Sequence, residues 1–474
     1  MSAHIHDPSH AVPSPTAVPD LSGLQRSVSR VHGWEPLRVE GIIPSEIRGT
    51  LIRTGPGLLE RFGRRLAHAF EADGALMAVR LDEGAAQGAV RVVQGAGYRH
   101  EQAAGRPMYG SAAPRWRRLL NNLRGQAKAT GNTNVIRWQG RTYALMEGAG
   151  PVEIDAATLE TLGESDLQGA VTGAFSAHPH RVASLGTTFN FGQVWGRRPG
   201  LDLYALPDTG AAKKFGHVEI PINAMVHDFA VTERHMVFVI CPAKLRLGKA
   251  LTASADFDQY FAWDPTLDAE LIVVPLDAPE RPLRIPVPAR WVFHLCNAHE
   301  RDGELVVDWV QYPDFNVFDA LSTNNPDASV LQPHVQRLVV DLRRGRLHSD
   351  EILWDHACDF PVLPAADVGR AYSTCWFATE GADSNGGIAR LDPTTGVVDA
   401  WQAGPGRSVS EAVLVPGADQ ARPDQGWLLA FVHDGWARES WLCVLDAETP
   451  SRGPVAKAWM GQALPTTYHG VFVD

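Results

Sequence analysis

The chain has 474 residues, of which 45% are hydrophobic and 20% charged, an ordinary composition for a soluble globular protein. Its formal net charge of -11 argues against a general nucleic-acid binder. No apolar run approaches the roughly 18 residues that cross a bilayer, and no secretory signal is visible. Five scattered cysteines without a CxxC pair fit reduced thiols, so we expect a cytoplasmic protein, and no feature indicates a protein partner.

The chain divides into a tail and one long domain. Residues 1–30 are rich in Pro, Ser and His and are expected to form a flexible tail. Over residues 31–474, short β-branched or aromatic runs alternate with Gly, Pro, Asp and Asn turns, and long amphipathic helices are scarce. No linker interrupts this alternation of short strands and turns, which predicts a single all-β domain.

A weak internal repeat runs through the domain as a strand that ends in an apolar-Asp step before a turn. Irregular spacing, mostly of about 50 to 70 residues, favours four-stranded antiparallel blades and hence a β-propeller over a two-sheet sandwich. The copies are Met77–Asp82, Val152–Asp155, Val274–Asp277, Val339–Leu342, Ile388–Asp392 and Leu442–Asp446.

The segment 114–124 differs from the strand-and-turn pattern of the rest of the domain, because it is basic and its apolar residues have helical spacing. The apolar residues are Trp116, Leu119, Leu120 and Leu123. Such a helix can dip into a bilayer surface while its arginines meet lipid phosphates. An ordinary surface helix packed on the barrel fits the pattern equally well.

Four histidines in apolar or turn-flanked surroundings stand out among the eighteen in the chain. They are His178, His227, His294 and His469. Their separation excludes a zinc finger or an HExxH helix, but inner strands of a propeller can direct imidazoles at one point. Imidazole suits Fe, Zn, Cu and Ni, and carboxylates such as Glu147, Asp359 and Glu411 could accept the other ring N–H.

From about residue 35 to the C-terminus the sequence resembles the carotenoid cleavage oxygenase family, as a bacterial-type member. Eight motifs in the family's order carry the resemblance: Gly49-Thr-Leu-Ile-Arg53-Thr-Gly-Pro56, His68-Ala-Phe-Glu-Ala-Asp73-Gly74, Asn132-Thr-Asn134, Leu145-Met-Glu147-Gly, Ser176-Ala-His178-Pro179, Val226-His227-Asp228-Phe229, Phe293-His294-Leu-Cys-Asn297-Ala298-His-Glu300 and His469-Gly470-Val-Phe472.

The resemblance implies a seven-bladed propeller with loops and short helices forming a lid over one face. It further implies a non-haem Fe(II) on the axis, with His178, His227, His294 and His469 as ligands and dioxygen as co-substrate. Glu147 and Glu411 match two of the family's three glutamates that hold ligand imidazoles. Asp359 occupies the third position, one methylene shorter, so its hydrogen bond is expected to be longer or bridged by water.

The implied activity is oxidative cleavage of a C=C bond into two aldehyde or ketone products. Stilbene-cleaving members have a lysine just before the first of these glutamates, where this chain has Met146. A thioether can line an apolar tunnel, which favours a carotenoid or apocarotenoid over a stilbenoid or phenylpropene. A polyene is drawn from a membrane, which would give the helix at 115–124 a use. A propeller binding module with structural histidines is the alternative of another class.

Overall fold

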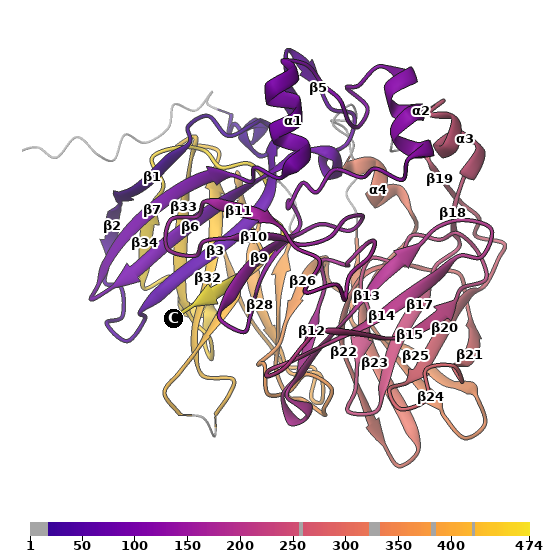
Figure 1. Ribbon diagram of the computed structural model, residues 1–474. Coiled ribbons are helices and arrows are strands. Elements are labelled where there is room, and N and C mark those ends of the chain that lie inside the picture. The colour runs from indigo at the N-terminus through magenta and orange to yellow at the C-terminus, as the bar shows by residue number, and fades with distance from the viewer. Residues whose placement is uncertain (1–17, 256–258, 322–331, 381–384, 420–421) are drawn as a thin grey trace, which may run out of the picture.

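The computed structural model describes residues 18–255, 259–321, 332–380, 385–419 and 422–474 (Figure 1). Every pairing between its named strands is antiparallel, and seven sheets of four or more strands form the blades of a β-propeller. The predicted all-β propeller is therefore confirmed. Within the described residues, no helix is long and apolar enough to span a bilayer.

Each blade starts at an inner strand and ends at an outer one. The first three blades are β35 (Gly470–Val473), β3 (Gly49–Leu58), β6 (Asp73–Asp82), β7 (Ala85–Val92), β1 (His32–Pro36); β8 (Asn134–Trp138), β9 (Arg141–Leu145), β10 (Val152–Ile154), β11 (Thr161–Glu164); and β12 (His180–Val182), β13 (Thr187–Val194), β14 (Gly200–Pro207), β15 (Lys213–Glu219). The next two are β16 (Ala230–Val231), β17 (His235–Ile240), β20 (Ala269–Pro275), β21 (Leu283–Val287); and β22 (Trp291–Arg301), β23 (Glu304–Tyr312), β24 (His334–Asp341), β25 (Arg346–Trp354). The last two are β26 (Cys358–Val362), β27 (Cys375–Thr379), β28 (Gly387–Leu391), β29 (Val398–Gln402); and β30 (Arg407–Val409) with β31 (Val413–Pro416), β32 (Gly426–Asp434), β33 (Glu439–Asp446), β34 (Ala456–Trp459), β2 (Arg38–Gly41).

The two ends of the domain close the ring. The C-terminal strand β35 pairs with β3 of the first blade, and the N-terminal strand β2 pairs with β34 of the last blade. Residues 18–30, expected to belong to a flexible tail, make backbone hydrogen bonds to the propeller, for example from Asp20 N to Gly435 O and from Val28 N to Gly57 O. Residues 1–17 lie outside the described part of the chain.

The six copies of the apolar-Asp repeat fall on the third strand of six different blades, namely β6, β10, β20, β24, β28 and β33. In the remaining blade the third strand, β14, ends in Pro207 before Asp208, which breaks the pattern. The repeat therefore marks the blade as the structural unit.

The core lies between neighbouring blades. Leu51 and Leu429 pack in the layer between the first and last blades, and Phe191 packs with Phe238 between the third and fourth. Each fully buried side chain of this kind stabilises the fold by about 1.5–3 kcal/mol. All five cysteines are buried and free, as expected for reduced thiols.

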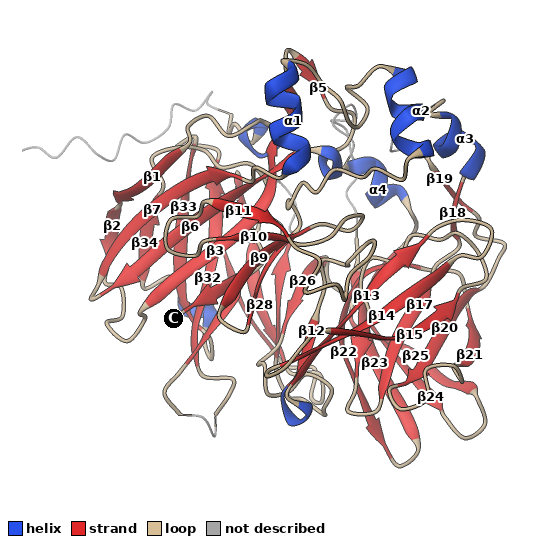
Figure 2. Cartoon of the chain, in the orientation of Figure 1, coloured by secondary structure: helices blue, strands red, loops and turns tan. Residues whose placement is uncertain are grey.

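Helices α1 (Ala96–Ala104), α2 (Arg115–Leu123), α3 (Leu247–Thr252) and α4 (Asn316–Ala320) gather on one side of the sheets (Figure 2). The short sheets β4 (Glu60–Arg61) with β5 (Arg64–Arg65), and β18 (Ala243–Leu245) with β19 (Phe261–Trp263), complete this lid. In the described part of the chain, short 3-10 helices connect other segments, namely η1 (Ser22–Gln25), η2 (Ala69–Glu71), η3 (Ala183–Leu185) and η5 (Pro450–Arg452).

A buried ion cluster ties the lid to the first blade. Lys128 Nζ lies 2.8 Å from Glu101 Oε2 in α1 and 2.7 Å from Asp73 in β6. Arg61 also pairs with Asp73. Because buried charges are costly unless paired, these contacts fix where α1 sits.

Candidate metal centre

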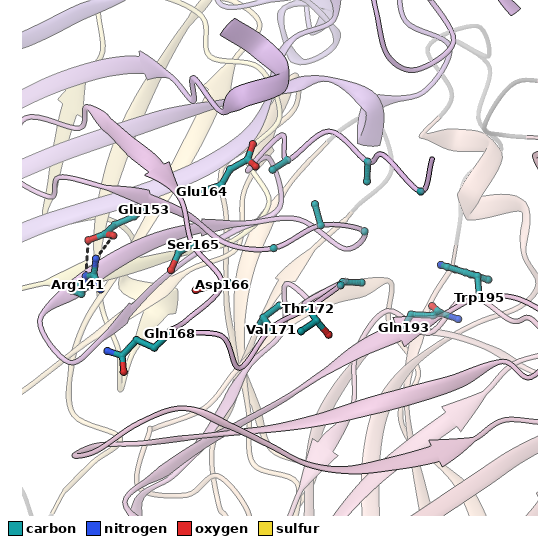
Figure 3. Close-up of a pocket in the computed structure, with 18 residues that line it drawn as sticks. Arg141, Glu153, Glu164, Ser165, Asp166, Gln168, Val171, Thr172, Gln193 and Trp195 are labelled. Carbon is teal, nitrogen blue, oxygen red and sulfur yellow. Dashed lines mark hydrogen bonds and ion pairs between the residues drawn. The ribbon is translucent and has the colours of Figure 1, made fainter. Parts of the chain in front are cut away.

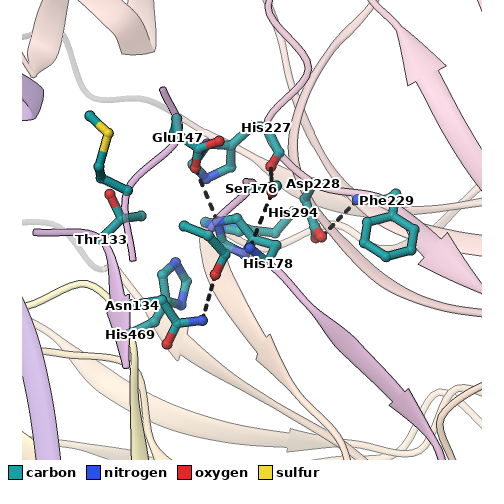
Figure 4. Close-up of polar contacts among 12 residues, drawn as sticks. Thr133, Asn134, Glu147, Ser176, His178, His227, Asp228, Phe229, His294 and His469 are labelled. Carbon is teal, nitrogen blue, oxygen red and sulfur yellow. Dashed lines mark hydrogen bonds and ion pairs between the residues drawn. The ribbon is translucent and has the colours of Figure 1, made fainter. Parts of the chain in front are cut away.

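The inner strands bring the four histidines together on the axis. His294 lies within β22, His469 directly precedes β35, and His178 and His227 lie just before β12 and β16. All four side chains are buried, and one ring nitrogen from each lies within 4.8 Å of the others. Figure 4 shows the imidazoles converging. Residues separated by most of the chain thus share one site because each blade begins at the axis.

The cluster fits a metal ion. Nε2 of His178 and Nε2 of His294 are buried and make no hydrogen bond to any described residue. Buried polar atoms are rarely left in this state without a ligand, a water or an ion. Four imidazoles form a donor set that suits Fe, Zn, Cu or Ni. Mg and Ca prefer oxygen ligands, which this cluster does not offer among its four donors.

Two carboxylates hold imidazoles from behind. Asp359 Oδ1 lies 2.7 Å from His294 Nδ1, and Glu411 Oε1 lies 2.7 Å from His469 Nδ1. An ionised carboxylate only accepts, so Nδ1 carries the proton and Nε2 keeps its lone pair toward the axis. The buried guanidinium of Arg53 in turn donates to Glu411 Oε2 at 3.1 Å and to Glu411 O at 2.9 Å.

Asp359 corrects one expectation, because its hydrogen bond to His294 is direct and short, neither lengthened nor bridged by water. The backbone supplies the missing reach. Strand β26 carries a register shift between Asp359 and Val362, and Phe360 has φ 57°, which is unusual for an aromatic residue. Tyr312 donates its hydroxyl to Asp359 Oδ2, and Phe360 N donates to Oδ1 at 2.7 Å.

Glu147 is held less firmly than the other two carboxylates. Its Oε1 lies 3.2 Å from His227 Nδ1 and 3.8 Å from His178 Nε2. The distance to His227 Nδ1 is within hydrogen-bonding range, but the two groups are not aligned. Glu147 Oε1 and His227 Nδ1 therefore make no hydrogen bond within the described residues. Glu147 therefore faces the cluster between two imidazoles as a nearby negative charge.

The electrostatics differ from one imidazole to the next. Burial and the three neighbouring imidazoles lower the pKa of His178 well below its usual value. Burial also lowers the pKa of His469, although Glu411 opposes it. At His294 burial again lowers the pKa, but Asp359 together with Asp228 and Glu411 outweighs it, so the pKa of His294 is raised. Burial thus favours the neutral, metal-binding form of His178 and His469, and Asp359 stabilises the Nδ1–H of His294.

Aromatic rings surround the cluster. Phe293 stands 5.0 Å from the ring of His227, and Phe360 stands 5.1 Å from His294 and 5.4 Å from His469, measured between ring centroids. Phe70 lies parallel to His227 at 6.4 Å and edge-on to Tyr468. The walls beside the imidazoles are therefore apolar.

Met146 and helix α2 carry the remaining residues that the sequence predicted, for the substrate tunnel and for membrane contact. Met146 is partly buried and its Sδ accepts a hydrogen bond from Gly148 N at 3.1 Å. In α2, Trp116 is 60% exposed and Leu123 76%, Leu119 is exposed, and Leu120 is half-buried. An adjacent side of the helix is fixed to α3, because Asn122 Nδ2 donates to Ala250 O at 2.7 Å and Arg115 Nε donates to Thr252 O at 3.3 Å.

A separate surface groove of about 840 Å³ runs past Gly148 and Gly150, on the loop that follows Glu147 (Figure 3). Its lining combines small residues with polar side chains, including the paired Arg141 and Glu153, and none of the four histidines lines it. This groove is therefore distinct from the metal centre.

Sequence reasoning missed Arg53, Tyr312 and Asp228 as parts of this site. Arg53 and Asp228 stand in motifs recognisable in the sequence, but nothing in those motifs indicates their partners. Tyr312 carries no local signal, since its partner Asp359 lies in the next blade.

The fold and the cluster define a seven-bladed propeller with a candidate metal centre on its axis. The family model described as "Retinal pigment epithelial membrane protein" matches residues 27–474, and the chain belongs to this family, that of the carotenoid cleavage oxygenases. The predicted family is confirmed.

The chain is similar over nearly its whole length to several characterised relatives. It is 29% identical to apocarotenoid-15,15'-oxygenase of Synechocystis sp., with 95% of each chain covered. It is 27% identical to lignostilbene-alpha,beta-dioxygenase isozyme III of Sphingomonas paucimobilis, covering 96% of this chain and 98% of the relative. The crystal structure of cobalt-substituted Synechocystis ACO matches with a TM-score of 0.86 at 27% identity, over 96% of this chain and 98% of that one.

Proposed function

We propose that this protein is a non-haem Fe(II) dioxygenase that cleaves a C=C double bond of a carotenoid or apocarotenoid. The observation that carries the proposal is the convergence of four buried imidazoles, backed by carboxylates, in a chain of the carotenoid cleavage oxygenase family. Similarity over nearly the full length to an apocarotenoid oxygenase supports the substrate class.

His178, His227, His294 and His469 would hold the iron through the ring nitrogens that face the axis. When bound, Fe(II) would supply the redox chemistry that activates dioxygen, the co-substrate. Asp359 and Glu411 accept the Nδ1 protons, so they fix the tautomer and orientation of two imidazoles and offset positive charge. Glu147 adds a third negative charge beside His227.

The protein's other contribution is to bind and shield an alkene. Phe70, Phe293 and Phe360 present apolar faces beside the imidazoles. Such walls exclude water and receive the flat face of a polyene. No general acid or base is required of the side chains, because cleavage of a double bond by dioxygen into two carbonyl groups needs no net proton transfer.

Met146 supports a polyene over a phenolic substrate. Its thioether stands just before Glu147, is partly buried, and offers no charge to a phenolate. Similarity to a lignostilbene dioxygenase makes a stilbenoid the second candidate.

The two candidates are separated by assaying the Fe(II)-reconstituted protein with apocarotenals and with resveratrol-like stilbenes, and measuring the aldehydes formed. We expect kcat/KM for an apocarotenal to exceed that for a stilbene by about tenfold or more, because a buried phenolate without a partner costs at least 1.4 kcal/mol. Faster cleavage of the stilbene would contradict the inference that Met146 favours a polyene over a phenolic substrate.

We further infer that α2 rests on a membrane surface. One face of this helix carries the exposed Trp116, Leu119 and Leu123, while an adjacent side is fixed to α3. Apolar side chains flanked by arginines are suited to the boundary between headgroups and acyl chains. A polyene dissolved in the bilayer would then reach the lid without crossing water.

A further inference from the structure

Asp228, the residue after His227, contacts three segments of the chain beside the metal centre, a role that the sequence did not predict. Its side chain is buried. Oδ1 lies 2.8 Å from His180 Nε2 and accepts a hydrogen bond from Phe229 N at 2.7 Å. Oδ2 accepts a hydrogen bond from Leu295 N at 2.8 Å. Figure 4 shows this carboxylate beside the imidazole cluster.

Each partner of Asp228 lies close in sequence to one of the histidines. His180 is two residues after His178 and begins β12, Phe229 is two residues after His227, and Leu295 directly follows His294 in β22. One carboxylate thus joins the inner ends of three consecutive blades.

The bond to Leu295 fills a gap in the sheet. The register of β22 against β23 shifts on both sides of Leu295, between Val292 and Leu295 and again before Asn297. Such bulges redirect side chains and disturb the regular pairing of a strand. At this irregular point Leu295 N donates to Asp228, so the position of His294 depends on that carboxylate as well as on the strand.

Neighbouring polar groups connect the blades in the same way. Asn134 Nδ2 donates to Ala177 O at 2.6 Å, and Ser176 Oγ donates to His227 O at 3.3 Å. These bonds run around the axis from the second blade to the fourth. Asp228 extends the series to the fifth blade and adds a charge, so its three hydrogen bonds are stronger than those between neutral groups.

We propose that Asp228 is a positioning residue of the metal centre: it holds His178, His227 and His294 in one mutual arrangement through the residues that flank them. This inference rests on the proposed function. It adds a fourth supporting carboxylate, which acts on the backbone and on His180, whereas Asp359 and Glu411 act directly on ligand rings.

The test uses Asp228→Asn, which keeps the size of the side chain but removes the charge and one acceptor. Asp308→Asn is the matched control. Asp308 is fully buried and accepts hydrogen bonds from Arg337 Nε at 2.7 Å and from Tyr372 at 2.6 Å. Both variants lose a buried charged hydrogen-bond network, so both are expected to lower the melting temperature.

The measured quantities are the affinity for Fe(II) and Co(II) and the visible absorption spectrum of the Co(II)-substituted protein. We expect Asp228→Asn to bind both metals about 10- to 100-fold more weakly and to shift the Co(II) bands. Asp308→Asn should keep the wild-type affinity within about twofold and an unchanged spectrum. Wild-type affinity and spectrum in a folded Asp228→Asn variant would overturn the inference.

A second variant carries the test if Asp228→Asn does not fold. His180→Phe removes one hydrogen bond to Asp228 while keeping an aromatic ring against Phe229, 5.0 Å away between centroids. We expect an affinity about 2- to 10-fold weaker than wild type. An unchanged affinity would overturn the positioning role. Failure of the wild-type protein to bind either metal would instead overturn the proposed function on which the role rests.

Discussion

Asp359 shows how the chain accommodates a shorter side chain at a supporting position. Its carboxylate reaches His294 Nδ1 at 2.7 Å because β26 bulges at this point and Phe360 adopts a positive φ. Tyr312 then fixes the second oxygen. Hydrogen bonds and the neighbouring His294 lower the pKa of Asp359 although burial alone would raise it. Backbone, tyrosine and aspartate therefore form one unit.

The variant Asp359→Glu tests this unit. Although it resembles the family pattern, we expect iron affinity and kcat/KM to fall about tenfold, because an added methylene would move the carboxylate from the position in which it bonds His294 Nδ1 and the Tyr312 hydroxyl. Iron titration and steady-state kinetics measure the two effects.

Asp350→Glu is the control, since Asp350 is an aspartate of the fifth blade whose side chain pairs with Arg290 at 2.8 Å. It should bind iron as the wild type does. An Asp359→Glu protein with equal or higher iron affinity would show that the bulge is unrelated to the shorter side chain.

Single residues of the site could be predicted only where a local motif marks them. The four histidines and Glu147 each stand in a short motif of the family, and Asp359 and Glu411 match positions of its supporting glutamates. The contacts of Arg53 with Glu411, and of Asp228 with Leu295, join segments from different blades. Such pairings depend on how seven blades close, which no short stretch of sequence encodes.

At the scale of elements, Glu300 fastens β22 to the neighbouring blade. It accepts hydrogen bonds from Thr232 Oγ1 at 2.7 Å and from Arg234, and His235 Nδ1 lies 2.8 Å away. Burial acts in the opposite direction, but these partners lower the pKa of Glu300 to about 2. Since its ordinary pKa is about 4.3, the carboxylate stabilises the fold above that pH, and this stabilisation is lost between about pH 4.3 and 2.

Glu300→Gln is therefore expected to lower the melting temperature at pH 7 by about 2 °C or more, and the difference should shrink as the pH falls below about 4. Thermal unfolding at pH 7, 5 and 3.5 measures it. Glu304→Gln is the control, because the pair that Glu304 forms with the exposed His348 contributes little. A difference that stays constant over this pH range would contradict the role of the ionised Glu300.

The lid helix α2 gives a second prediction for an element. Replacing Trp116, Leu119 and Leu123 together by serine should reduce liposome binding about tenfold or more, since the apolar area available to the bilayer is lost. Flotation with vesicles measures the bound fraction. The control replaces Leu162, Ile352 and Val397, which are similarly exposed; Leu162 and Ile352 lie in the outer strands β11 and β25, and Val397 directly precedes the outer strand β29. Equal flotation of both triple variants would contradict the membrane role of α2.

At the scale of the whole molecule, the closure of the ring and the metal centre share the same segments of the chain. His469 directly precedes β35, and this strand pairs with β3, so the last segment of the chain both closes the propeller and completes the cluster. In the same region Arg53, from β3, bonds to Glu411 and to the carbonyl of Tyr468. Closure and metal-site assembly are therefore coupled.

The propeller could be predicted from the sequence because the apolar-Asp repeat recurs on the third strand of six blades. The number of blades could be predicted only from the family resemblance. The third strand of one blade ends in Pro207 and lacks the repeat, and the spacing between the other copies is irregular. Where β2 and β35 pair could not be deduced, because sequence pattern does not say which distant strands meet at the closure.

The iron content of anaerobically purified protein, reconstituted with Fe(II), tests the central claim most directly. We expect about one iron per wild-type chain and less than about a tenth in His294→Ala, because a direct ligand is lost. His299→Ala should retain the wild-type content, since His299 lies in the same strand but outside the cluster. Less than about a tenth of an equivalent in the wild type, or full iron in His294→Ala, would contradict the assignment and favour a binding module with structural histidines.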